Sequence, residues 1–410
     1  MLCKLAWRNI WRQKRRTLLT AGSIATTLLL VLLMRGLQEG SYSANIDNSA
    51  RFHTGLIQLQ HPDFADSNSI DDLVSMDDAF IAPTLQEAAV THRLPRIESF
   101  ALAAAGERSK GAMIFGMTPS LEIAYSGIDS RLIAGTFMQD DDTTSAVVGE
   151  GLARSFGLEV GDELVLYGQG YRGQTAAGLY SIAGIVRFPM PEMDKQLVYL
   201  SLPAAQQLFS TEDQITAWVL HVDTVAQVAA ITQRLQTVFG ERVNVRDWQS
   251  LSPQLAQQMT LDRVGNTFVM SLLYGIVGFG LFATLIMMTL ERQREFAVML
   301  ATGMVRCTLL RLLVLESSLI AAIGMGAGAL LALPILTWLY FNPIEFTGDN
   351  AQMMLEMGWE PIVPVHLSFG LFAEQIFTVS VLVVVCLLYP LWRAYRLDVV
   401  SSLKGGAHAH

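Results

Sequence analysis

The sequence predicts an α-helical membrane protein with four transmembrane helices and one inserted α+β domain. Three observations support this fold class. Four apolar runs are each long enough to cross a bilayer. A polar stretch of roughly 230 residues, with short strand-like and helical runs, separates the first apolar run from the second. Apolar residues make up 51% of the chain and charged residues only 16%, which fits spans combined with a water-exposed domain.

The first predicted element, residues 1–16, is an amphipathic helix that lies in the membrane interface. Apolar and basic residues recur on its two sides at helical spacing: Cys3, Trp7, Ile10 and Trp11 against Lys4, Arg8, Arg12 and Arg15. This helix runs straight into the first span, residues 17–36, in which Thr17–Met34 carries no charge. A cleaved signal peptide with a cut near Ser41–Ala44 is the alternative. The long, regular basic region and the length of the apolar run argue against it.

Residues 37–263 form the inserted domain, which begins with a helix over Gly36–Arg51 that continues out of the first span. Short apolar runs predict strands at Gly55–Gln60, Ser99–Ala105, Lys110–Met117, Ala146–Gly149, Glu163–Tyr167, Leu179–Val186, Gln196–Ser201 and Ala217–Val222. Helices are expected at Met76–His92, Gly151–Phe156, Leu202–Phe209 and Val225–Phe239. This mixture of strands and helices is typical of an α/β or α+β domain.

Three further spans follow the domain, at residues 266–290, 307–339 and 369–392. A charged segment, residues 291–306, joins the second span to the third, and a loop, residues 340–368, joins the third to the fourth. Small residues let helix backbones approach closely in lipid. Those of the second and third spans indicate either packing within one subunit or a seam between subunits: Gly275, Gly278 and Gly280, and Ala321, Gly324, Gly326 and Gly328.

Lys and Arg residues set the predicted orientation. The segment before the first span has six of them, the 291–306 segment has three, and the tail, residues 393–410, has three. The 340–368 loop has none. Positively charged loops stay on the cytoplasmic side. We therefore expect both termini and the 291–306 segment in the cytoplasm, and the inserted domain and the 340–368 loop outside.

The sequence predicts neither catalysis nor a bound cofactor or metal. It contains no GxxxxGK[ST] loop, no GxSxG elbow and no HExxH pair. Its seven histidines are scattered, and the aspartates at 71–72 and 140–142 lack the spacing of a Ca²⁺ loop. The net charge of −9 argues against nucleic acid as a partner. One acid, Glu316, lies inside an apolar run, and we expect Arg311 or Arg306 to supply its counter-charge.

The segment Leu290–Met304, LERQREFAVMLATGM, is more apolar than a linker needs to be. An apolar stripe at helical spacing comprises Phe296, Met299, Leu300 and Gly303. A short amphipathic helix without a domain of its own to pack against is expected to bind a protein partner. We predict that Phe296 and Leu300 anchor this partner and that Arg294 and Glu295 orient them.

The same segment resembles the signature that follows the second span in the FtsX-like permeases of ABC transporters. It matches that signature at Glu291, Arg292, Glu295, Phe296, Ala297, Ala301 and Gly303. The tail PLWRAYRLDVVSSLK resembles the ending of that family, with Val399 in place of the usual proline. In the inserted domain, AGTFMQDDDTTSAVVGEGLARSFGLEVGDELVL resembles the MacB-type periplasmic core domain that macrolide-exporter and lipoprotein-releasing (LolC and LolE) permeases share.

The resemblance implies a permease subunit of the bacterial inner membrane whose inserted domain is periplasmic. It also implies a second permease chain, identical or related, and two copies of a separate ATPase subunit that holds ATP and Mg²⁺. Residues 291–306 would be the coupling helix, and the resemblance gives the coupling role to Glu291, Arg292, Arg294, Glu295, Phe296, Leu300, Ala301 and Gly303. Closure of the ATPases would move the periplasmic domains by mechanotransmission. Because the sequence opens on the interfacial helix and not on an ATPase, we expect the lipoprotein-releasing branch or an uncharacterised branch with a freestanding ATPase.

Two functions compete at this stage. A transport permease would extract or export a lipid-anchored or amphipathic substrate. It needs an apolar lining at the outer ends of the first two spans, for which the sequence offers Leu28, Leu32, Leu33, Val264, Phe268 and Leu272. A non-transporting regulator would instead activate a cell-wall hydrolase or sense envelope stress through a docking face on the domain. A periplasmic lipoprotein or carrier and membrane lipid are the further expected partners.

Overall fold

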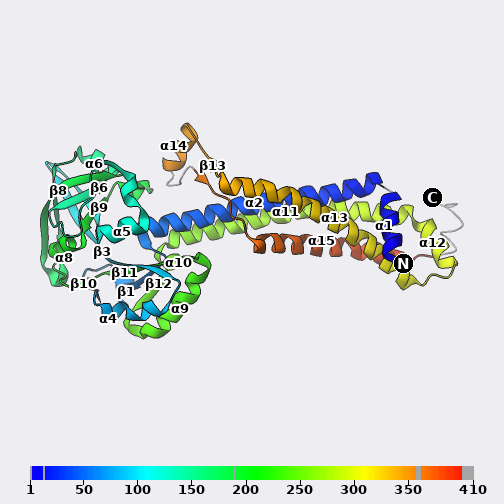
Figure 1. Cartoon of the computed structure of the whole chain (residues 1–410), viewed down its shortest axis with the longest axis horizontal. Coiled ribbons are helices and arrows are strands. Elements are labelled where there is room, and N and C mark those ends of the chain that lie inside the picture. Colours follow the sequence, from blue (N-terminus) through cyan, green and yellow to red (C-terminus); the bar gives the residue numbers. More distant parts are fainter. Residues whose placement is uncertain (1, 13, 189, 357–361, 399–410) are drawn as a thin grey trace. The chain divides into compact units, whose positions relative to one another are not determined.

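The computed structural model describes residues 2–12, 14–188, 190–356 and 362–398. Contacts within the chain divide it into two compact units. The first unit comprises Met1–Ser41, Met259–Ile344 and Val363–His410, and the second comprises Tyr42–Gln258 and Glu345–Ile362. Figure 1 shows helices in the first unit and a mixture of strands and helices in the second.

Among its described residues, the first unit is built from α1 (Leu2–Arg12), α2 (Lys14–Ser49), α11 (Pro253–Glu291), α12 (Gln293–Ala301), α13 (Arg306–Phe341) and α15 (Phe369–Tyr395). Four of these, α2, α11, α13 and α15, are long and apolar enough to cross a membrane. Their number and positions agree with the four predicted spans. The helix α2 extends beyond the predicted first span and ends in a π-helical turn, Ala50–Thr54, as the prediction of a helix over Gly36–Arg51 anticipated.

The amphipathic helix and the first span were predicted as two adjoining elements. The described helix α1 ends at Arg12 and α2 begins at Lys14, and Figure 1 draws the two in different directions. Ala6 and Ile10 on α1 are buried, and α1 packs against α13. The apolar side of α1 therefore contacts protein within the same unit, while Trp7 and Trp11 remain about half exposed.

Close packing of α2 against α13 forms the centre of the bundle. Leu28 and Leu32 of α2 are fully buried there, together with apolar residues of α11, α13 and α15. A Cβ atom on Gly324 would lie 2.7 Å from the Ala21 carbonyl oxygen, and one on Gly328 would lie 2.7 Å from that of Ala25. These two glycines therefore serve packing within one subunit. A Cβ on Gly275, Gly280 or Gly326 would meet nothing within 4 Å.

The second unit contains most of the strands. They are β1 (Ile57–Gln60), β2 (Val74–Ser75), β3 (Val90–Ala105), β4 (Arg108–Met117), β5 (Leu132–Gly135), β6 (Ser145–Gly149), β7 (Glu163–Gln169), β8 (Thr175–Val186), β9 (Leu197–Ser201), β10 (Gln214–Ile215), β11 (Ala217–Val222) and β12 (Asn244–Asp247). Its helices are α3 (Phe64–Ser67), α4 (Asp78–Ile81), α5 (Pro119–Ser126), α6 (Glu150–Phe156), α7 (Pro191–Asp194), α8 (Leu202–Phe209), α9 (Val228–Phe239), α10 (Trp248–Leu251) and α14 (Asp349–Glu356). The short strands β13 (Ile344–Glu345) and β14 (Ile362–Val363) flank α14.

Strand pairing in this unit closes a ring. The order β3-β4-β9-β6-β8 continues into β7, which pairs with both β8 and β3. The pairs β4–β9 and β6–β8 are parallel and the others in the ring are antiparallel. The long strand β3 also serves a second sheet, because its first half pairs with β11, which continues into β1 and β12.

The helix α8 packs inside the ring. An apolar core that includes Phe115, Val147, Val186 and Tyr199 lies on the opposite face of the ring strands, because Phe115 and Gly116 point to opposite faces of β4. The helix α8 packs so closely on β4 that a Cβ on Gly116 would lie 2.2 Å from the Ala205 Cβ. The domain is thus an α+β fold, as predicted, with its interior formed by alternate residues of each ring strand.

One predicted helix of this domain is wrong. The stretch Met76–His92 forms α4, a 3-10 turn over Ala82–Gln86 and the start of β3 at Val90. Residues 90–96 pair with β11, and this non-local pairing overrides the local helix preference. The eight predicted strands are all present, but β3 and β8 begin several residues earlier than predicted.

Candidate functional site

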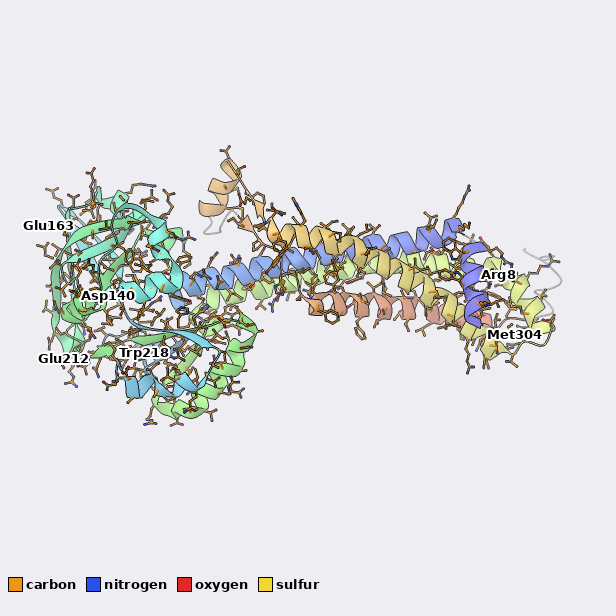
Figure 2. The ribbon with its side chains drawn as sticks, viewed as in Figure 1. Arg8, Asp140, Glu163, Glu212, Trp218 and Met304 are labelled. Atoms are coloured by element: carbon orange, nitrogen blue, oxygen red, sulfur yellow. The ribbon has the colours of Figure 1, made fainter. Side chains whose placement is uncertain are left out.

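The candidate site is the short helix α12 between α11 and α13. The helix α11 ends at Glu291, and α12 runs from Gln293 to Ala301. Gly303 adopts φ +101°, a conformation that L side chains rarely adopt, and this residue turns the chain toward α13. Figure 2 labels Met304 in that turn and Arg8 on α1, both in the helical unit.

One side of α12 is buried within the chain itself. Phe296 and Ala297 have no exposed area and pack with Leu309 and Leu313 of α13 and with residues at the end of α15. Leu300 is partly buried against the same cluster. Phe296, which the sequence analysis expected to anchor a partner, is buried against this chain's own helices. The apolar stripe does have a surface of its own to pack on, supplied by α13 and α15.

A buried ion pair holds the start of this segment. Arg292 donates to Glu316 of α13, and Asn9 Nδ2 of α1 donates to the other Glu316 oxygen at 2.6 Å. The Arg292 guanidinium also lies 5.2 Å from the Phe296 ring centroid. The predicted counter-charges are wrong, because Arg311 is exposed and Arg306 donates to the Tyr395 and Leu397 carbonyls.

Two more ion pairs join α12 and the end of α11 to the N-terminal helices. Arg12 of α1 pairs with Glu295, and Arg16 of α2 pairs with Glu291. Glu295 also pairs with Arg292 at 3.2 Å. We term these side chains, with Asn9 and Glu316, the α12 clasp. Three of the charged signature residues of the sequence, Glu291, Arg292 and Glu295, therefore bind the chain's own helices.

The opposite side of α12 is free to meet a partner. We term it the α12 outer face, and its exposed residues are Arg294, Val298, Ala301, Thr302, Gly303 and Val305. It combines one charged side chain with small and branched apolar ones, a mixture suited to a protein interface. Of the residues predicted for coupling, Arg294, Ala301 and Gly303 lie on this face.

The residues predicted to line a substrate cavity lie in two different environments. Leu28 and Leu32 are buried in the bundle and Leu33 is partly buried, so α2 offers little of the expected lining. Val264, Phe268 and Leu272 are 57–71% exposed along α11. We term the exposed residues at helical spacing on this helix the α11 stripe: Leu261, Val264, Phe268, Leu272, Ile276 and Phe279. Of the four candidate spans, α11 buries the smallest share of its most apolar window, 22%.

An exposed apolar surface lies on the outside of the strand ring. Leu102 faces Tyr167 across β3 and β7, and Val165 faces Leu179 across β7 and β8. Together with Phe100, these side chains are 42–57% exposed, and we term them the ring patch. A contiguous apolar surface on a water-exposed domain marks an interaction site more often than scattered exposed residues do.

A buried polar network lies beneath the junction of the π-helical turn with the sheets. Arg96 of β3 binds both carboxylate oxygens of Glu122 on α5, at 2.6 and 2.9 Å, and donates to the His53 carbonyl oxygen. Burial raises the pKa of Glu98 to about 7, although Arg96 at 3.8 Å acts in the opposite direction. Burial and then the charge of Arg96 lower the pKa of His53 to about 4. The sequence does not predict this network, since a lone Arg in a strand gives no local signal of burial.

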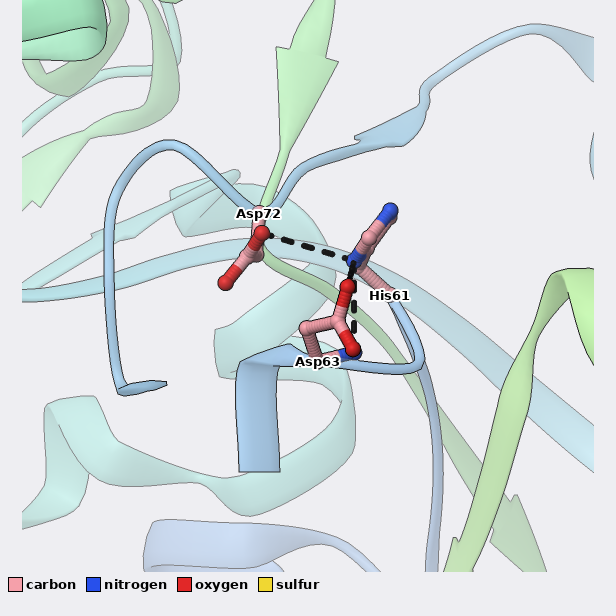
Figure 3. A group of neighbouring side chains, drawn as sticks. All are labelled: His61, Asp63 and Asp72. Atoms are coloured by element: carbon pink, nitrogen blue, oxygen red, sulfur yellow. Dashed lines mark hydrogen bonds and ion pairs between the residues drawn. The ribbon is translucent and has the colours of Figure 1, made fainter. Parts of the chain in front are cut away.

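Three potential metal ligands meet near the loop after β1. His61 Nδ1 lies 3.8 Å from an Asp63 oxygen and 3.5 Å from an Asp72 oxygen (Figure 3). The Asp63 backbone N–H donates to the same His61 nitrogen at 3.3 Å, and Ser67 donates to Asp72. These hydrogen bonds stabilise the loop after β1, and we therefore assign His61, Asp63 and Asp72 a structural role in that loop.

Two family profiles match this chain. The family described as a MacB-like periplasmic core domain matches residues 17–238, and the one described as an FtsX-like permease C-terminal matches residues 267–399. The second match contains α12 and its outer face, and the first contains the strand ring.

Proteins of similar sequence include subunits of lipoprotein-releasing systems and exporters with a fused ATP-binding part. The lipoprotein-releasing system transmembrane protein LolC of Xylella fastidiosa is 23% identical over 79% of this chain and 80% of LolC. LolE of the same kind of system, from Haemophilus influenzae, is 23% identical over 76% of each protein. The macrolide export ATP-binding/permease protein MacB of Nitrosomonas europaea is 22% identical over 98% of this chain and 58% of MacB.

Proposed function

Because this chain belongs to the FtsX-like ABC transporter permeases with a MacB-like periplasmic core domain, we propose that it couples cytoplasmic ATP hydrolysis to movement of that domain. The movement releases a lipid-anchored or amphipathic substrate from the bacterial inner membrane. Two copies of a separate ATPase subunit hold ATP and Mg²⁺, and this chain is a permease without catalytic residues of its own. The names of the LolC and LolE relatives support the lipoprotein-release form of this proposal.

The α12 clasp is the observation that supports coupling most directly. Glu295 of α12 pairs with α1, and the adjoining Glu291 and Arg292 pair with α2 and α13. Phe296 is buried against α13, so α12 is coupled to these helices. A partner that displaces the α12 outer face therefore displaces these helices with it. We assign ATPase docking to that outer face and a clamping role to Glu291, Arg292, Glu295 and Phe296.

A substitution on the α12 outer face tests this assignment. Val298 is 47% exposed, and Val298→Asp should reduce co-purification of the ATPase subunit and ATP hydrolysis by at least tenfold, since interface anchors contribute about 2 kcal/mol or more. Val160→Asp is the matched control, because Val160 is 44% exposed in the other unit. Normal ATPase recovery with Val298→Asp would refute the assignment. A purified complex without any ATP-hydrolysing subunit would refute the coupling function itself.

We assign the lipid part of the substrate, and the second permease chain, to the α11 stripe. A photoreactive residue at Phe268 should form adducts with a lipid-anchored protein or with another permease chain. The same probe at Leu330 on α13, which is 76% exposed, is the control for random contact in the bilayer. Equal adducts from the two positions would contradict the assignment of the α11 stripe.

The ring patch favours a second candidate function. A docking face on the domain is what a regulator of a periplasmic cell-wall hydrolase, or of an envelope-stress response, would need. The same face also suits a carrier that receives a released lipoprotein. Reconstituted vesicles that hold the complex and a lipid-anchored protein separate the two functions. ATP-dependent release of that protein supports transport, and activation of a hydrolase without release supports regulation.

A further inference from the structure

A basic hollow beside α1 and the start of α2 shares Arg12, Arg16 and Glu291 with the α12 clasp and adds two cations, Lys14 and Arg15, that the clasp does not use. Its volume is about 510 Å³, and it is lined by Trp11, Arg12, Lys14, Arg15, Arg16 and Glu291. We propose that this hollow binds the phosphate headgroup of an anionic phospholipid from the adjacent membrane leaflet. The site requires only that the four apolar helices lie in a membrane, and so it stands apart from the proposed function.

The charge balance of the hollow calls for an anion. Two of its four cations are neutralised, because Arg12 pairs with Glu295 and Arg16 pairs with Glu291. Lys14 is exposed and lies 5.8 Å from the centroid of the Trp11 ring. Arg15 is exposed and has no charged partner among the residues that the structure describes. Lys14 and Arg15 therefore bring two uncompensated positive charges to one concave surface, and a phosphate group is their chemical complement.

The surroundings favour a lipid over a soluble phosphate. Leu18 and Leu19 are 65% and 76% exposed, and they follow Arg15 by three and four positions on the same helix. A ligand whose phosphate contacts Arg15 would therefore have its apolar part beside these leucines. Trp7 and Trp11, with ring centroids 5.9 Å apart, remain exposed on α1, as tryptophans do at a membrane–water interface.

Native mass spectrometry of the detergent-purified full chain tests the site. Phosphatidylglycerol should bind in preference to phosphatidylcholine, and Lys14→Ala with Arg15→Ala should weaken its binding roughly tenfold or more. Lys4→Ala with Arg8→Ala removes the same charge from exposed residues of α1 that do not line the hollow, and should leave binding unchanged. The single replacement Arg15→Gln gives a milder variant, and circular dichroism verifies that each protein is folded.

Three results would overturn the proposal. Unchanged phosphatidylglycerol binding by both Lys14/Arg15 variants would remove the site. An equal loss of phosphatidylglycerol binding in the Lys4/Arg8 control would show that the lipid responds to the overall positive charge of the chain and not to a defined site in the hollow. Displacement of the lipid by millimolar inorganic phosphate would identify a site for free phosphate. Because none of these measurements uses ATP, they remain decisive even if the coupling function fails.

Discussion

Glu316 shows how single residues decide the behaviour of this protein. It is 2% exposed inside a candidate span, and Arg292 and Asn9 satisfy its two oxygens. The sequence identified Glu316 as an acid inside an apolar run, and Arg311 or Arg306 was the predicted partner. Spacing along one helix suggested those partners, whereas the true ones come from α1 and from the segment before α12, and only the packing of the bundle brings them together.

Removal of one partner of this buried pair should be costly. Glu316→Ala leaves the buried Arg292 with only the partly exposed Glu295 as a charged partner, and we expect a loss of about 3 kcal/mol in unfolding free energy. Arg311→Ala is the matched control, because Arg311 is exposed on the same helix, and it should change stability by less than about 0.5 kcal/mol. Thermal unfolding of the purified chain in detergent measures both. Similar melting of the two variants would contradict the structural importance of the pair.

Glu98 and His53 should oppose each other in the dependence of domain stability on pH. The folded pKa of Glu98, about 7, lies above its usual 4.5, so this residue makes the domain less stable as pH rises between those values. The folded pKa of His53, about 4, lies below its usual 6.5, so this residue makes the domain more stable as pH rises between about 4 and 6.5.

Replacement of Glu98 should therefore leave the effect of His53 on the pH dependence of stability without its opposing contribution. Glu98→Gln should lose about 1 kcal/mol more stability than the unsubstituted protein when pH falls from 7 to 5. Thermal unfolding of the full chain at the two pH values, followed by the fluorescence of its tryptophans, measures the difference. A Glu98→Gln protein whose pH response matches that of the unsubstituted chain would show that the two groups do not titrate as described.

At the scale of elements, helices with local start signals were predicted best. The predicted range Leu202–Phe209 coincides with α8, because the Ser201 side chain caps the helix by accepting from the Ala204 N–H. The strand β5 was missed because its four residues are mostly exposed and show no alternation. The apolar stripe of α12 also did not predict that this side of the helix packs against α13 and α15 of the same chain. Periodicity shows that a helix has an apolar side but not whether its own chain or a partner covers that side.

The glycines of α13 give a matched pair at this scale. Gly324→Leu should destabilise the bundle by several kcal/mol, because even a Cβ at this position lies 2.7 Å from the Ala21 carbonyl oxygen of α2. Gly326→Leu adds a side chain where a Cβ meets nothing within 4 Å, and should be tolerated or mildly stabilising through helix propensity. Thermal unfolding and the yield of folded protein distinguish them, and equal damage from both would contradict the packing of α13 on α2.

At the scale of the whole molecule, the sequence predicted the domain organisation but not the exposed interaction surfaces. Four spans, an inserted α+β domain and an ABC transporter permease all followed from apolar runs and short motifs. The ring patch did not, because Leu102, Tyr167 and Leu179 come from three strands that only the ring closure brings side by side. Surfaces assembled from distant segments have no signature within any one of them.

The ring patch gives a prediction at this scale. Tyr167→Glu should abolish delivery of substrate to a periplasmic partner and leave ATP hydrolysis and folding unchanged, because Tyr167 is 55% exposed on the outside of the ring. Leu85→Glu is the control, since Leu85 is 64% exposed elsewhere in the domain. The transfer of a lipid-anchored protein from reconstituted vesicles is the measurement. Normal transfer by the Tyr167→Glu complex would exclude the ring patch as the docking face.

The closure of the strand ring by β7 also bears on how the domain matures. Both edges of β7 are paired, and the edge strands that remain at the ends of the sheet, β5 and β12, have four residues each. Short edges discourage intermolecular strand addition. The sequence places no cysteine between Cys3 and Cys307. The domain therefore folds without a disulfide of its own, and its maturation is independent of thiol oxidants and disulfide isomerases.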